Sequence, residues 1–110
     1  LYMRTLIKDA LNEAGYEVIG EAENGETAID LALELDPDII TLDNILPDMI
    51  GTDILRVLKE EGLTGHIVMI SAVGQQSVID EGLSLGAADY IVKPFTSDKL
   101  VEIINRISGE

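Results

Sequence analysis

The segment DPDIITLDNILPDMIG, residues 36–51, decides how this chain folds. It opens with Asp36-Pro37-Asp38, which ends a preceding helix because a residue before proline is pushed out of the helical region. The next four residues, 39–42, form a short apolar run that predicts a buried strand ending at Asp43. A loop then leads into a helix predicted from about 52 to 60.

The same switch between helical and strand patterns continues on both sides of this segment. Gly15 follows the first helical pattern where a C-terminal cap belongs, Asn24 can cap the second helix, and Ser97 can cap the last. Strands that are apolar throughout and alternate with helices indicate an α/β fold whose parallel sheet is covered on both faces. We predict helices over 3–14, 24–35, 52–60, 75–85 and from 97 onward, and strands over 17–22, 39–42, 67–70 and 89–92.

Length and composition restrict the function. The chain has 110 residues, 46% apolar and 25% charged, which predicts one globular domain over residues 1–110. Its 21 acidic and 7 basic residues give a net charge of −14, which disfavours binding to nucleic acid or to an anionic membrane surface. It has no cysteine, no apolar run long enough to span a bilayer and no signal-peptide pattern, so we expect a cytoplasmic protein.

Three predicted strands end in polar residues that suit phosphoryl chemistry. Asp43, Ser71 and Lys93 should meet, because the carboxyl ends of parallel strands share one edge of the sheet. A carboxylate can attack phosphorus to form an acyl phosphate, while an ammonium and a hydroxyl can bind the phosphoryl oxygens. Mg²⁺ would complete the set, but it prefers several oxygen ligands and no second carboxylate follows another predicted strand.

The stretch Asp43–Gly51, the pair Ser71-Ala72 and the triplet Lys93-Pro94-Phe95 resemble the receiver domain of two-component response regulators, in order and in spacing. The resemblance covers essentially all of the chain and is greatest to the CheY-type single-domain chemotaxis regulators. It implies a flavodoxin-like, doubly wound parallel sheet. It also implies a signalling switch rather than an enzyme, in which a histidine kinase phosphorylates an aspartate.

The resemblance assigns a role to individual residues. Asp43 matches the phosphoacceptor, Ser71 the switch hydroxyl, Lys93 the charge-sensing lysine and Tyr90 the aromatic that turns inward on activation. A motor, adaptor or phosphatase protein would bind the face made by the predicted helix 75–85, strand 89–92 and the last helix.

The remaining implied roles concern the surroundings of Asp43. Asn44 and Ala72 would border the phosphoryl group together with Lys93. The backbone carbonyl of Ile45 would bind Mg²⁺ beside Asp43, and the peptide bond before Pro94 would be cis.

The sequence departs from the family at its start, because the family's first strand and the acid pair that holds the metal do not precede the first helix. That strand would lie between those predicted at 17–22 and 39–42. We therefore expect weak Mg²⁺ binding and poor phosphorylation. We also expect a folded sample to rearrange, to swap elements with a second chain, or to carry a further N-terminal segment. Ile45 and Val73 would flank the attacking water and, being apolar, predict slow loss of phosphate.

Two other functions fit parts of the sequence. A degenerate or truncated receiver could act only as a protein-binding or dimerising module. A small phosphohydrolase could use Asp43 as its nucleophile, but such enzymes usually place a second aspartate where Ile45 stands. Tyr90 could simply be a core tyrosine, and we expect His66 at the surface and Asp48 to be a solvated acid.

Overall fold

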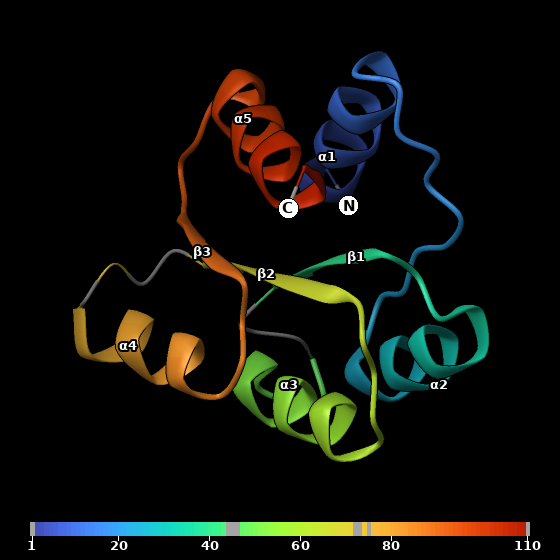
Figure 1. The fold of residues 1–110 in the computed structure, drawn as a ribbon, viewed down its shortest axis with the longest axis vertical. Coiled ribbons are helices and arrows are strands. Elements are labelled where there is room, and N and C mark those ends of the chain that lie inside the picture. The colour runs from blue at the N-terminus through green and yellow to red at the C-terminus, as the bar shows by residue number, and fades with distance from the viewer. Residues whose placement is uncertain (1, 44–46, 72–73, 75, 110) are drawn as a thin grey trace.

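The computed structural model describes residues 2–43, 47–71, 74 and 76–109, and Figure 1 shows its fold. The described residues form five helices and three strands, and strands and helices alternate after an opening pair of helices. Their bounds are α1 Tyr2–Glu13, α2 Gly25–Leu35, β1 Ile39–Asp43, α3 Gly51–Glu60, β2 His66–Ser71, α4 Gln76–Ser84, β3 Asp89–Val92 and α5 Ser97–Ser108.

The strands form one parallel sheet in the order β1-β2-β3. Asp43 at the end of β1 is in register with Ile70, and Ser71 at the end of β2 is in register with Val92. All three strands therefore finish at the same edge. The predicted α/β class with a parallel sheet is confirmed.

Helices cover the sheet on both faces, α1 and α5 on one side and α2, α3 and α4 on the other (Figure 1). Alternate residues of β2 serve the two layers: Val68 and Ile70 pack in the core beneath α5, and Ile67 and Met69 pack in the core above α3. All four side chains are fully buried. This two-sided burial explains why β2 is apolar along almost its whole length.

Local signals account for most helix ends. Gly15 has φ +94°, the left-handed conformation that glycine adopts without strain, and it follows α1 as predicted. The Asn24 side chain accepts a hydrogen bond from the Thr27 amide at 2.9 Å and caps α2. The prediction for α5 was wrong by one residue, because Thr96 rather than Ser97 caps it and accepts from the Lys99 amide at 3.1 Å.

The strand predicted at 17–22 is wrong: residues 17–22 belong to no strand of the structure. The residues that line a groove of about 630 Å³ include this segment on one side and β1 on the other. A strand exists only by hydrogen bonding to a neighbour, and the groove keeps this segment from the edge of β1. The rearrangement of elements offered as one outcome is not seen, since the described helices and the other three strands keep their predicted order.

Candidate functional site

The carboxyl-terminal edge of the sheet carries the polar residues predicted to meet there. Asp43 ends β1, Ser71 ends β2, and Lys93 follows β3 directly. The backbone amide of Lys93 donates a hydrogen bond to the Ser71 carbonyl at 2.7 Å, so the pairing of β2 with β3 continues into the site. The Lys93-Pro94 peptide bond is cis, as the family resemblance implied.

The Lys93 side chain joins two strands that are not neighbours. Its Nζ lies 2.9 Å from Asp43 Oδ2, so the ammonium reaches across β2 from the end of β3 to the end of β1. The side chain of Asp43 is 38% exposed and that of Lys93 is 23% exposed. A carboxylate that is paired with a cation and still open to solvent can receive a charged group without first being uncovered.

Ser71 and Tyr90 lie deeper in the molecule. Ser71 is 1% exposed, and Tyr90 is 8% exposed and belongs to the core between the sheet and α3. The Tyr90 ring packs on the backbone of Gly82 in α4, where an added Cβ would lie 3.4 Å from the ring. Tyr90 therefore occupies an inward position. It lies in the core, and its role as a switch residue stays a prediction.

Several predicted site residues cannot be placed. Asn44, Ile45, Ala72 and Val73 lie outside the described residues, and the roles assigned to them stay predictions. Within the described ranges, no group of three or more His, Cys, Asp or Glu side chains could hold a metal ion. Asp43 is a carboxylate that the described part of the chain offers to Mg²⁺ at this edge, without two further ligands of these kinds beside it.

Asp48 has a role that its sequence position did not reveal. It is exposed, as expected of a solvated acid, and its carboxylate also accepts hydrogen bonds from the amides of Gly25 at 2.6 Å and Glu26 at 3.1 Å, at the start of α2. These bonds, the one from Gly25 above all, lower the pKa of Asp48, against the opposing effect of desolvation. No sequence signal could have found the contact, because its partners lie 22 and 23 residues away in another element.

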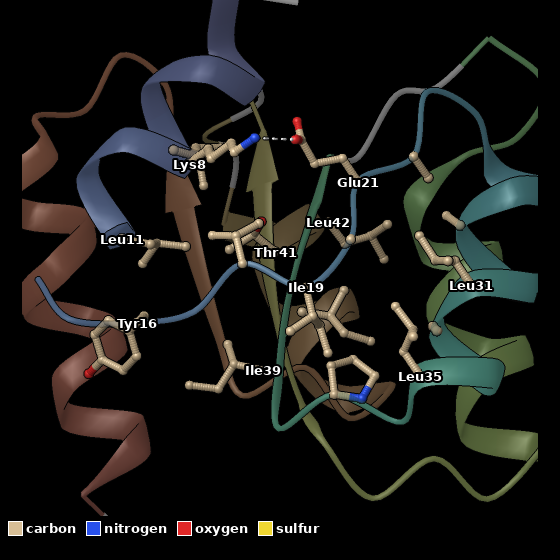
Figure 2. A pocket seen from close by; sticks show the side chains of 18 of the residues that line it. Lys8, Leu11, Tyr16, Ile19, Glu21, Leu31, Leu35, Ile39, Thr41 and Leu42 are labelled. Atoms are coloured by element: carbon tan, nitrogen blue, oxygen red, sulfur yellow. Dashed lines mark ion pairs between the residues drawn. The ribbon is translucent and has the colours of Figure 1, made fainter. Parts of the chain in front are cut away.

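The groove opens beside the candidate site. Its lining includes β1 residues up to Asp43 and the segment 16–23, closed in by α1 and α2 (Figure 2). Most of this lining is apolar, and an ion pair between Lys8 and Glu21 at 3.3 Å crosses one end of the groove. The edge of β1 that faces the groove pairs with no described strand.

The face expected to bind partners, made by α4, β3 and α5, exposes Leu83 and Val92 at 42% and 38%.

His66 is exposed at the start of β2, as expected. Among the helices of the described residues, none is long and apolar enough to cross a membrane.

Comparison with known proteins identifies the family to which this architecture belongs. Residues 2–105 match the response regulator receiver domain. The chain is 42% identical to the chemotaxis protein CheY of Thermotoga maritima over 107 residues, which cover 97% of this chain and 89% of that protein. It is 43% identical to CheY of Bacillus subtilis over 105 residues, which cover 96% and 88% of the two chains.

Solved structures give the same result. The chain resembles one in the CheX-CheY-BeF3-Mg complex of Borrelia burgdorferi with a TM-score of 0.93, 28% identity and coverage of 97% of this chain and 81% of that one. It resembles the receiver domain of the regulator NarL of Mycobacterium tuberculosis with a TM-score of 0.91, 27% identity and coverage of 99% and 90%.

Proposed function

Because this chain belongs to the response regulator receiver domain family, whose members are signalling proteins, we propose that it is the phosphoacceptor switch of a chemotaxis phosphorelay. In this proposal a histidine kinase phosphorylates Asp43, and the modified domain then binds a downstream protein through the face of α4, β3 and α5. The observation that carries it is the contact between Asp43 and Lys93. It supplies a nucleophile and a counter-charge at an accessible edge of the sheet.

The proposed reaction uses groups whose positions are known. The donor in this proposal is a phosphorylated histidine of the kinase. An oxygen of the Asp43 carboxylate attacks the phosphorus, and the bond between the phosphorus and the histidine nitrogen breaks. Its electron pair stays on the imidazole, which takes up a proton. The Lys93 ammonium, already 2.9 Å from that carboxylate, offsets charge on the transferred group. The Ser71 hydroxyl, at the end of the adjacent strand, would donate a hydrogen bond to a phosphoryl oxygen.

The signal would arise from the new charge at this edge. An acyl phosphate adds negative charge and strong acceptor oxygens next to the buried Ser71, and Tyr90 lies two strand positions before Val92, the register partner of Ser71. A shift of Ser71 toward the phosphoryl group would favour one packing of Tyr90 against α4. That packing would decide which form of the partner face is presented.

Receiver domains generally bind Mg²⁺, and the Borrelia complex contains it. The described residues do not by themselves fit this ion, because Asp43 stands without two further carboxylate or imidazole ligands among them. We therefore propose weak Mg²⁺ binding by residues 1–110.

We propose further that an extended segment from outside residues 1–110 occupies the groove as a strand parallel to β1. The unpaired edge of β1 offers the hydrogen-bonding groups, and the apolar lining offers burial to side chains on both faces of a strand. Such a strand would also bring its carboxyl end beside Asp43. There, added acids would improve the metal site.

The experiment treats two proteins with acetyl phosphate and Mg²⁺: residues 1–110, and the same chain preceded by a strand ending in two aspartates. Intact mass is then measured with and without Asp43→Asn. An adduct of one phosphoryl group that disappears in the variant supports the switch, and tighter Mg²⁺ binding by the extended protein supports the strand. Equal Mg²⁺ affinities refute the strand, and continued hydrolysis of the donor indicates a phosphohydrolase.

A role as a binding module without phosphorylation is the second candidate. The observation that favours it is that the described residues hold no metal-binding group of three ligands. Absence of any adduct in both proteins would support this role and refute the switch.

A further inference from the structure

Two contacts join the chain after Asp43 to the start of α2. The Asp48 carboxylate accepts two hydrogen bonds, one from the Gly25 amide to Oδ1 at 2.6 Å and one from the Glu26 amide to Oδ2 at 3.1 Å. These amides belong to the first turn of α2, where no intrahelical carbonyl is available to accept from them. One side chain therefore satisfies two helix donors and fixes its own main chain to them.

The second contact is steric. Gly25 is buried, and a Cβ added to it would lie 2.7–2.9 Å from Met49 Sδ, Cβ and Cγ. The residue after Asp48 therefore packs directly on the helix backbone, at a distance that only glycine permits. Met49 also packs against the core between the sheet and α3.

The helix has a separate cap of its own. Asn24 serves the third amide of α2, that of Thr27. Asn24 and Asp48 thus stabilise the same helix end, but only Asp48 connects that end to the chain following the candidate phosphoacceptor. This difference separates stabilisation of the helix from positioning of the site.

We propose that Asp48 is a positioning residue for phosphoryl transfer: by binding the first turn of α2 it fixes the main chain five residues after Asp43 to that helix. The proposal rests on the proposed function of Asp43. Asp43 is held on one side by the pairing of β1 with β2, and Asp48, five residues later, anchors the chain on the other. Release of this anchor would let the site widen, and small errors in the position of reacting groups slow such reactions strongly.

The test compares Asp48→Ala with Asn24→Ala, two variants that each remove a cap from the same helix. Urea unfolding measures stability, and intact mass gives the initial rate of the acetyl phosphate adduct as the donor concentration is varied. We expect similar losses of stability. The maximal rate should fall about tenfold in Asp48→Ala and stay unchanged in Asn24→Ala. The maximal rate of Asp48→Asn, which keeps one acceptor oxygen, should lie between those of Asp48→Ala and the unmodified chain.

Equal rates for Asp48→Ala and the unmodified chain overturn the proposal, as does an equal fall in both variants. A second readout does not depend on phosphorylation: the ¹³C signal of the Asp43 carboxyl and the Lys93 Cε signal should shift in Asp48→Ala and not in Asn24→Ala. If no protein forms an adduct, the proposed function fails. The NMR signals then still decide whether Asp48 positions Asp43, and unchanged signals refute it.

Discussion

Replacement of Lys93 by methionine should separate the functional from the stabilising value of the Asp43–Lys93 ion pair. Methionine keeps most of the length and apolar stem of lysine and removes the ammonium 2.9 Å from Asp43 Oδ2. Because 38% of the Asp43 side chain and 23% of the Lys93 side chain remain exposed, water screens the pair. Pairs exposed to this degree contribute about 0.2–1 kcal/mol to the free energy of unfolding.

The loss in reaction rate should be much larger than the loss in stability. Removal of one well-placed donor to a developing charge typically slows a reaction by about 10²–10³-fold. We therefore expect Lys93→Met to lower the rate of Asp43 phosphorylation by about two orders of magnitude, while the free energy of unfolding falls by about 1 kcal/mol or less.

The assay measures both quantities on the same samples: urea unfolding followed by circular dichroism, and adduct formation followed by intact mass. Arg56→Met is the matched control, because it also removes one positive charge from an ion pair. Arg56 pairs with Asp53 at 3.2 Å on the exposed side of α3. Its rate should not change. A phosphorylation rate for Lys93→Met within threefold of the control would refute a role for the pair in the reaction. A loss of more than about 3 kcal/mol in the free energy of unfolding would show that the pair mainly stabilises the fold.

Three further predictions concern the fold. Thr96→Ala should lower the free energy of unfolding by about 1 kcal/mol and Ser97→Ala by much less, because Thr96 provides the cap of α5; equal losses in urea unfolding would contradict this. Leu55→Ala should lower the free energy of unfolding by about 3 kcal/mol, because Leu55 is fully buried. Leu83→Ala, on the exposed surface of α4, should change it by no more than about 0.5 kcal/mol. Similar losses for the two variants in urea unfolding would show that the core is misassigned. Asp48 has a pKa lowered by its backbone hydrogen bonds, so its contribution to stability is present above the unfolded pKa of about 3.9 and is lost as the pH falls through the lower folded pKa. The stability difference between the unmodified chain and Asp48→Asn in urea should therefore narrow below about pH 4, and a constant difference would contradict the contact.

The juxtaposition of Asp43, Ser71 and Lys93 at one edge could be inferred from the sequence, because an apolar strand alternating with helices implies a parallel sheet. The ends of such strands fall on one side whatever the details of packing. The pairing of Lys93 with Asp43 across β2 then needed only a side chain long enough to span one strand.

Other features depended on partners that are distant in the sequence. Residues 17–22 carry a strand pattern, yet a strand requires a hydrogen-bonding neighbour, and the structure places a groove there. Thr96 and Ser97 can both cap a helix, and the structure shows that Thr96 has the extended backbone of the N-cap and accepts from the Lys99 amide.

The sequence by itself determined the alternation of helices and strands, the parallel sheet and the polar residues at its edge, because these follow from local periodicity and from strand ends. Only the tertiary structure decided that Asp48 binds the start of α2, that Gly25 must admit Met49, and that the edge of β1 faces a groove. The physical reason is that periodicity is a property of neighbouring residues. Hydrogen bonds and close packing between elements instead depend on how the elements are placed in space.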